Sequence, residues 1–221
     1  MDFEFDTTVP KRNKFFFALY LFFKRVFDIF ASVIGTVLLS PLFLAIAIAI
    51  KADDGGRVFY KHERVGYKGK KIFIYKFRSM REDANENLES VLTPEQLEQY
   101  RTEYKIDNDP RITRVGSFLR RTSLDELPQF INIIMGSLSL IGPRPLVEKE
   151  LEMYGDAKDK LLSAKPGLTG YWQVYARNTV GYENGERQKM ELYYVDHRSL
   201  LFDTKLFFKT FVSVIKKTGA K

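Results

Sequence analysis

A long apolar run near the N-terminus constrains this chain of 221 residues more than any other feature. Residues 29–50 are apolar apart from a few small or hydroxyl residues and the Ser40-Pro41 pair, and the run is as long as a membrane helix. A cleaved signal peptide fits poorly, because the run starts far into the chain and is followed by Lys51-Ala-Asp-Asp-Gly-Gly. A buried core helix also fits poorly, because a chain of this size seldom encloses a helix that is apolar on every face.

The charges that flank this run give no direction for crossing a membrane. Five basic residues precede the run and five follow it within a similar distance, namely Lys11, Arg12, Lys14, Lys24 and Arg25 before it and Lys51, Arg57, Lys61, Arg64 and Lys68 after it. Both flanks can be cytoplasmic if the segment enters and leaves on the same side. The Ser40-Pro41 pair can bend the helix, because proline removes a backbone donor and the serine hydroxyl can satisfy a freed carbonyl. We predict a re-entrant helix broken at Ser40 and Pro41, with a kinked spanning helix as the alternative.

The predicted organisation has three parts. Residues 1–24 form an interfacial segment, residues 25–50 the re-entrant helix, and residues 51–221 a cytoplasmic domain. The domain ends in an amphipathic helix over residues 200–217. Its apolar arc carries Leu200, Leu201, Phe207, Phe208, Phe211, Val212, Val214 and Ile215, while Phe202 and Leu206 fall on the polar side. A helix on a protein core gives the same pattern, but its Phe and Lys residues also suit the surface of anionic lipid.

Composition excludes several classes of site. The chain has no cysteine, which removes disulfides, cysteine zinc sites, iron–sulfur clusters and thiol nucleophiles, and two histidines give almost no material for a histidine metal cluster. Thirty-five Lys and Arg against 28 Asp and Glu give a net charge of +7. This excess favours an anionic partner, namely nucleic acid, anionic lipid or a phosphorylated substrate.

The middle of the chain is expected to be a mixed α/β section that holds the chemistry. Residues 57–80 are typical of a β-hairpin around Gly66-Tyr-Lys-Gly69. An acidic insertion over residues 82–108 contains a helix start with a capping box at Thr93-Pro-Glu-Gln96. A helical run ends at Met135-Gly136, and a polar helix is predicted over residues 146–162.

Anion-binding candidates are separate cations, because the chain has no phosphate-cradling glycine loop. Two prolines flank Arg144 and reduce the entropy that its guanidinium would lose on clamping a phosphate. The other candidates are Lys76, Arg78, Arg120 and Arg177. Each of these alone is more often a solvated surface cation.

The adjacent Asp125 and Glu126 are the strongest candidates for chemistry. We place them in the first turn of a helix, where the helix dipole favours the ionised carboxylate. An ionised carboxylate can act as a nucleophile and is a hard ligand for Mg²⁺. Ser123-Leu-Asp-Glu126 also has the spacing of a capping box, and spacing alone favours that structural interpretation.

Six motifs in order change that balance: Lys76-Phe-Arg-Ser-Met80, Asp109-Pro-Arg-Ile-Thr113, Ser123-Leu-Asp-Glu-Leu-Pro-Gln129, Gly142-Pro-Arg-Pro145, Pro166-Gly-Leu-Thr-Gly170 and Trp172-Gln173. The set resembles the bacterial sugar transferase family, the monotopic phosphoglycosyl transferases. The resemblance covers nearly the whole chain, from about residue 24 to residue 218.

The resemblance implies transfer of a sugar-1-phosphate from a UDP-sugar to polyprenyl phosphate, with Mg²⁺, at the cytoplasmic face of the bacterial inner membrane. It places the nucleophile at Asp125, with Glu126 as its partner in the catalytic dyad. It places Arg144, Lys76 and Asp203 in the substrate site, and the helix break at Ser40-Pro41. The pathway would be exopolysaccharide, capsule or protein glycan assembly, and a homodimer is a candidate assembly.

Departures from the family pattern are His62, where a glutamine is common, and Glu191, where an aspartate is common. Two other functions stay open beside the enzyme. A basic, membrane-anchored adaptor would explain the anchor and the charge but not the six motifs. Nucleic acid is not expected as a partner, because the aromatic residues cluster in apolar runs and do not alternate with cations. Release of UMP from a UDP-sugar would separate the enzyme from both.

Overall fold

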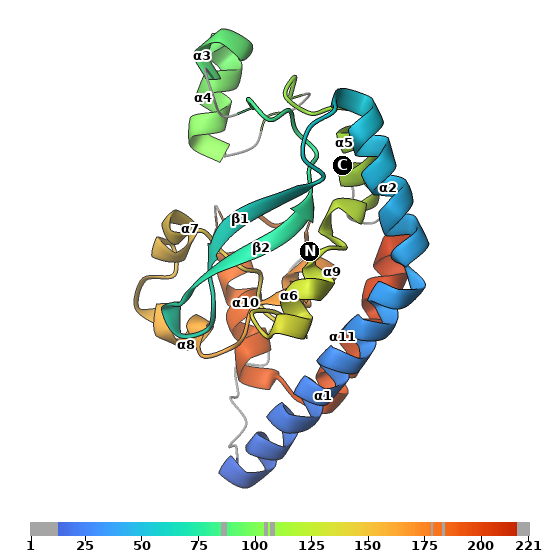
Figure 1. Cartoon of the computed structure of the whole chain (residues 1–221). Coiled ribbons are helices and arrows are strands. Elements are labelled where there is room, and N and C mark those ends of the chain that lie inside the picture. The colour runs from blue at the N-terminus through green and yellow to red at the C-terminus, as the bar shows by residue number, and fades with distance from the viewer. Residues whose placement is uncertain are drawn as a thin grey trace. The chain divides into compact units, whose positions relative to one another are not determined.

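A computed structural model of the chain describes residues 13–84, 88–103, 106, 109–177, 179–182 and 184–215. This part of the chain divides into two units. The first contains residues 13–38, 61–75 and 129–215, and the second contains residues 39–60 and 76–128. Helices dominate, with short strands between them (Figure 1), so the expected mixture of helix and strand is confirmed. The predictions for residues 1–12 and 216–221 lie outside the described residues.

Helix α1 (Lys14–Leu38) of the first unit has an unusual distribution of side chains. Its buried residues are Tyr20, Asp28 and Ser32, whereas most of its large apolar side chains are exposed. A helix on a water-surrounded core normally shows the reverse pattern. The helix also runs through the predicted boundary between residues 24 and 25 without a break.

Helix α2 (Ser40–Asp54) of the second unit follows after one residue, and Pro41 takes a position in its first turn, where a missing N–H breaks no helical bond. No single helix of the described chain is long and apolar enough to cross a membrane, but α1 and α2 together reach that length and composition and bend by 60° where they meet. The helix break expected at Ser40-Pro41 is therefore present. A re-entrant path through a membrane stays a prediction.

Strands β1 (Phe59–Val65) and β2 (Lys71–Phe77) form the predicted hairpin. Their connection contains the short 3₁₀ helix η1 (Tyr67–Gly69), and Gly69 has a φ of 75°, which favours glycine. The hairpin ends at Phe77, whose side chain is 1% exposed. In the sequence, Lys76 and Arg78 are the two neighbours of this core residue.

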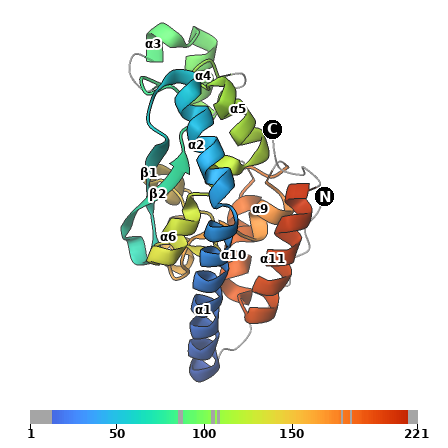
Figure 2. The same ribbon diagram turned by 45° about the vertical axis from the view of Figure 1, so that its right-hand side comes forward.

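In the second unit, the acidic insertion contains α3 (Leu88–Val91) and α4 (Pro94–Glu103). The predicted capping box of α4 is confirmed: the Thr93 hydroxyl accepts from the Gln96 N–H at 3.2 Å, and the Gln96 side chain accepts from the Thr93 N–H at 3.1 Å. Helix α5 (Arg114–Thr122) lies beside α2 in both views (Figures 1 and 2). The core of this unit is formed by Ile46, Ile50, Phe77 and Leu119.

In the first unit, helix α6 (Gln129–Met135) ends as predicted before Gly136, and it leads to a two-stranded parallel sheet. Strand β3 (Ser139–Ile141) pairs with β4 (Gly167–Thr169), with Ser139 opposite Gly167. A side chain at Gly142 would place its Cβ 2.4 Å from the Lys165 carbonyl oxygen, so the chain after β3 must be glycine to pass this close. The core packs around Ile133, Leu138, Ile141, Tyr194 and Leu206.

The single polar helix predicted over residues 146–162 is wrong. The structure has α7 (Glu148–Glu152), the 3₁₀ helix η3 (Gly155–Ala157) and α8 (Lys158–Leu162) in its place. Gly155 has a φ of 50°, a left-handed conformation that interrupts a right-handed helix. The interruption follows Tyr154, whose side chain is buried in a small cluster with Leu161 and Val195.

The chain of the first unit continues through α9 (Tyr171–Tyr175), α10 (Glu186–His197) and α11 (Leu200–Ile215). Helix α11 lies beside α1 in both views (Figures 1 and 2). It turns Leu206 fully into the core, although the helical wheel places that residue on the polar side. The predicted apolar arc faces outward at Leu200, Leu201, Phe208, Phe211 and Val212. The helical wheel therefore identifies the apolar arc, and these five exposed side chains do not pack on the core of the first unit.

Candidate active site

The acidic pair Asp125-Glu126 lies in the second unit, in a single turn of 3₁₀ helix, η2 (Leu124–Glu126). Helix α5 ends just before it at Ser123, which has a φ of 55° and donates its N–H to the Arg120 carbonyl at 3.2 Å. A helix N-cap needs an extended backbone, so Ser123 cannot cap the following turn, and its side chain makes no capping bond there. The interpretation of Ser123 to Glu126 as a capping box is therefore wrong.

The two carboxylates share the ammonium of Lys76 at the end of β2. Lys76 Nζ lies 2.9 Å from Glu126 Oε1 and 3.6 Å from Asp125 Oδ2. The Asp125 and Glu126 side chains are 12% and 18% exposed, and that of Lys76 is 24% exposed. The structure thus brings Lys76, Asp125 and Glu126 together, with side chains that are largely shielded from water.

Arg120 is the second predicted cation of this unit. It lies on the last turn of α5, and its Nε donates to the Ser79 hydroxyl at 2.9 Å. Burial lowers the pKa of the Arg120 guanidinium, and the attraction of the nearby Asp125 carboxylate opposes that change. Arg120 is therefore a partly buried positive charge that acts on Asp125.

Arg78, also a predicted substrate ligand, is turned away to other partners. Its guanidinium pairs with both oxygens of Asp54 and donates to the carbonyl oxygens of Arg57 and Met80. The side chain is 7% exposed. Each of its three guanidinium nitrogens therefore donates to a partner within the protein.

Arg144 belongs to the first unit, in the loop that follows β3. Its backbone N–H donates to both carboxylate oxygens of Glu191 at 3.2 Å, and its guanidinium lies 6.0 Å from the centre of the Trp172 ring. Burial raises the pKa of Glu191 to about 7, and the positive charge of Arg187 opposes this rise. The buried Glu191 side chain thus fixes the backbone of the loop that carries Arg144. Arg177, half-buried, comes two residues after the end of α9 in the same unit.

Asp203 lies at the start of α11 and is surrounded by donors of the first unit. It accepts from the Tyr20 hydroxyl at 2.9 Å, from the Tyr194 hydroxyl at 2.8 Å and from Lys24 Nζ at 2.7 Å. The side chains of Lys24 and Asp203 are 13% and 10% exposed. Asp203 thus joins α1, α10 and α11, and the resemblance alone gave no indication of these contacts.

A second cluster, in the first unit, was not predicted from the sequence. The Arg187 guanidinium lies 4.0 Å from the centre of the Trp172 ring and 3.9 Å from that of Tyr182, and Glu191 follows Arg187 by four residues on α10. Two opposite charges four residues apart on a helix are neighbours, so this spacing was the available signal. Glu191 holds the loop of Arg144 through the Arg144 N–H, and neither Arg187 nor Glu191 belongs to the predicted motifs.

The donor set of the acidic pair suits Mg²⁺. No group of three or more His, Cys, Asp or Glu residues that could hold a metal ion occurs within the described ranges. Mg²⁺ is commonly bound through one or two carboxylates, with substrate phosphates and water as the other ligands. The hard oxygens of Asp125 and Glu126 match that requirement for a metal shared with a diphosphate.

Comparison with known proteins gives a consistent set of relatives. Residues 19–217 match the family described as bacterial sugar transferase. The chain is 45% identical over 199 residues to the exopolysaccharide production protein ExoY of Rhizobium meliloti (strain 1021), a match that covers 89% of this chain and 87% of that protein. It is 44% identical over 201 residues to the undecaprenyl-phosphate galactose phosphotransferase of Salmonella typhimurium, covering 90% of this chain and 42% of the relative. It is 37% identical over 193 residues to the UDP-glucose:undecaprenyl-phosphate glucose-1-phosphate transferase of Escherichia coli (strain K12), covering 85% and 39%.

Proposed function

The chain belongs to the bacterial sugar transferase family, and we propose that it transfers a sugar-1-phosphate from a UDP-sugar to polyprenyl phosphate. The names of two relatives, a galactose phosphotransferase and a glucose-1-phosphate transferase that act on undecaprenyl phosphate, support this reaction class. The observation that carries the proposal is the shielded pair Asp125 and Glu126 facing the ammonium of Lys76. A pair that served only as a helix cap would need neither the lysine nor the shielding.

The proposed chemistry has two steps with one covalent intermediate. First, an Asp125 carboxylate oxygen bonds to the phosphorus that carries the sugar, and the bond between that phosphorus and the oxygen bridging to the uridylyl phosphate breaks. UMP leaves with the bridging oxygen, and the sugar phosphate stays on Asp125 as an acyl phosphate. Second, a phosphate oxygen of polyprenyl phosphate attacks the same phosphorus and releases the Asp125 carboxylate. The products are UMP and a polyprenyl diphosphate sugar.

The neighbouring residues have separate roles in this scheme. Lys76 offsets the repulsion between the two carboxylates and orients Glu126 through a hydrogen bond of 2.9 Å. Arg120 adds a positive charge beside Asp125, which stabilises the anionic phosphoryl group during transfer. Asp125 and Glu126 would hold Mg²⁺, which supplies neutralising charge to the diphosphate when bound. Arg144, presented on a fixed loop, is the proposed fork for a phosphate of the nucleotide.

A lipid substrate requires a site at a membrane surface, and the first unit carries matching features. The outward side chains of α1 are largely apolar, and α11 turns an apolar arc outward. We assign both helices to the cytoplasmic face of the inner membrane, with the break at Ser40-Pro41 allowing a re-entrant path. Cysteine labelling tests this assignment cleanly, because the chain has no cysteine of its own. Labelling of a cysteine at residue 6 from the periplasm would contradict the re-entrant path.

The deciding experiment measures release of UMP by the purified protein from a panel of UDP-sugars with Mg²⁺ and undecaprenyl phosphate. UDP-galactose is the first to test, because relatives at 44% and 46% identity are named for galactose. EDTA should stop release, and added Mg²⁺ should restore it. No release from any UDP-sugar in the presence of lipid would favour the membrane-anchored adaptor.

A further inference from the structure

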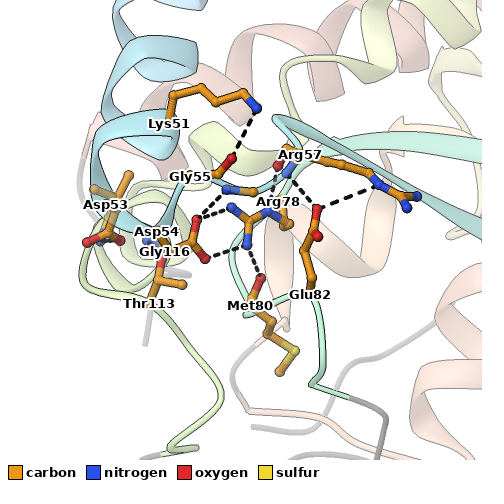
Figure 3. Close-up of polar contacts among 12 residues, drawn as sticks. Lys51, Asp53, Asp54, Gly55, Arg57, Arg78, Met80, Glu82, Thr113 and Gly116 are labelled. Carbon is orange, nitrogen blue, oxygen red and sulfur yellow. Dashed lines mark hydrogen bonds and ion pairs between the residues drawn. The ribbon is translucent and has the colours of Figure 1, made fainter.

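Helix α2 ends in two adjacent carboxylates within the second unit (Figure 3). Gly55, at a φ of 74°, closes the helix by donating its N–H to the Lys51 carbonyl at 3.1 Å, and Lys51 Nζ donates to the Gly55 carbonyl. A helix C-terminus carries partial negative charge, so Asp53 and Asp54 stand where carboxylates are unfavourable for the helix itself. Their presence calls for partners elsewhere, and the structure provides one for each.

Asp54 is paired with the Arg78 guanidinium (Figure 3). Arg78 Nη1 donates to Asp54 Oδ2 at 2.6 Å, Nη2 donates to Asp54 Oδ1, and Nη1 also donates to the Met80 carbonyl at 3.0 Å. This hydrogen bonding holds the pKa of Asp54 below its ordinary value. A side chain at Gly56 would place its Cβ 2.6 Å from Arg78 Nη2. The glycine therefore leaves room for the Arg78 guanidinium.

Asp53 is bonded to the start of helix α5. Its Oδ2 accepts from the Val115 N–H at 3.1 Å, while the Thr113 hydroxyl caps the same helix through the Gly116 N–H at 2.9 Å. A Cβ at Gly116 would lie 2.0 Å from the Ser79 carbonyl oxygen, and the Thr113 N–H donates to that oxygen at 3.2 Å. Helix α5 therefore begins in close contact with both the end of α2 and the residue after Arg78.

The bonds of Asp54 to Arg78 and of Asp53 to the start of α5 connect the end of α2 to the two parts of the candidate active site, Lys76 and the Asp125-Glu126 pair. Lys76 is the second-last residue of β2 and Arg78 directly follows the end of that strand, while the acidic pair follows directly after α5. We propose that Asp53 and Asp54 are positioning residues, which set the distance between Lys76 and the Asp125-Glu126 pair by holding the end of β2 and the start of α5 on one helix terminus. This inference rests on the proposed function and assigns Arg78 to positioning instead of substrate binding.

The test follows the burst of UMP released from UDP-galactose before lipid is added, because rate and amplitude report different things. Asp54→Asn should slow the burst about 10- to 100-fold, as expected for a catalytic group displaced by about 1 Å, while the amplitude stays near one UMP per enzyme. Arg78→Lys should slow it similarly, and the double variant should be no more than about twofold slower than the slower single variant. Asp53→Ala should slow the burst, whereas Asp53→Asn should stay within about threefold, because its amide oxygen can still accept from the Val115 N–H.

Arg57→Gln is the matched control. It breaks the Arg57–Glu82 pair of the same unit, whose side chains are 87% and 50% exposed, and it should leave the burst unchanged. A normal burst rate in Asp54→Asn would overturn the inference. A smaller amplitude at a normal rate would also overturn it, because that result means that less protein is folded while the folded protein reacts normally. If the unaltered protein gives no burst with any UDP-sugar, the proposed function fails, and hydrogen exchange then tests the positioning alone. Faster exchange of residues 71–80 and 113–122 in Asp54→Asn but not in Arg57→Gln supports it, and unchanged exchange overturns it.

Discussion

Two clusters of this chain each place a lysine against carboxylate, and they differ in how the negative charge is matched. In the second unit, one ammonium, that of Lys76, faces the two carboxylates of Asp125 and Glu126. In the first unit, Lys24 faces the single carboxylate of Asp203, which also accepts from two tyrosine hydroxyls. The first cluster joins two adjacent carboxylates to one ammonium, with the Arg120 guanidinium as a second positive charge near Asp125, and this arrangement suits the proposed nucleophile and metal ligand. The second cluster gives a single carboxylate one ammonium and two hydroxyl donors, which suits a fixed structural contact.

An Asp→Asn substitution in each cluster tests this difference most directly. The larger effect is expected for Asp125→Asn. An amide is not a usable nucleophile, so the burst and the turnover should both fall by at least about 1,000-fold. The side chain keeps its size, so thermal unfolding should change by no more than a few degrees. Mass spectrometry after incubation with UDP-sugar should find a phosphosugar adduct in the unaltered protein and none in the variant. Normal turnover in Asp125→Asn would show that the acidic pair has a structural role only, and that the two clusters do not differ in function.

Asp203→Asn should have the opposite profile. Asp203→Asn removes the negative partner of a largely buried ion pair and leaves the positive Lys24 ammonium unpaired by charge. This should lower the free energy of unfolding by about 3 kcal/mol. Denaturant unfolding in detergent measures this loss, and the folded fraction should retain a UMP burst. Glu186→Gln, in the exposed pair with Lys189, is the control and should cost less than about 0.5 kcal/mol.

The partner variant tests whether the cost in Asp203→Asn arises from the pair. Lys24→Met combined with Asp203→Asn removes both charges, so its cost should be less than the sum of the two single costs. Additive costs would show that Lys24 and Asp203 act separately. A stable Asp203→Asn without any burst would instead place Asp203 in the substrate site, as the resemblance implied.

Local features of this fold could be predicted from the sequence, because the interacting residues are neighbours along the chain. The hairpin over residues 57–80 and the capping box of Thr93 and Gln96 involve spacings of a few residues. The acidic pair could be found from its position in a motif. The left-handed conformation of Ser123 could not, because it depends on how α5 ends rather than on residue type.

Long-range contacts account for what the sequence could not supply. Tyr20 and Asp203 are 183 residues apart, and Arg78 lies 24 residues from Asp54, so no periodicity relates them. The direction in which α11 faces is a similar case. A helical wheel shows that Leu206 is separated from the apolar arc, but only tertiary packing shows that Leu206 is the buried residue.

Arg144 belongs to neither cluster, and Arg144→Lys tests whether it binds a phosphate of the UDP-sugar. A lysine keeps the charge but cannot form the two parallel hydrogen bonds of a guanidinium on a phosphate, so kcat/KM for the UDP-sugar should fall by about 10- to 100-fold. Unfolding should be little changed, because the loop is held through the Arg144 backbone N–H, which the substitution keeps. Near-normal kcat/KM would show that Arg144 is a surface cation without a role in binding.

A pH-dependent effect is expected at Glu191, a buried carboxylate of the first unit that belongs to neither cluster. Burial raises its pKa from an ordinary value near 4.5 to about 7, so the folded state binds a proton more tightly than the unfolded state. Its contribution to stability is therefore greatest below about pH 4.5 and is lost as the pH rises toward 7, by an amount of the order of 3 kcal/mol. Glu191→Gln cannot titrate, so the difference in unfolding free energy between the variant and the unaltered protein should change in that direction between pH 4.5 and 7. A constant difference across this range would show that Glu191 stays ionised in the fold, with the charge of Arg187 and the Arg144 N–H outweighing its burial.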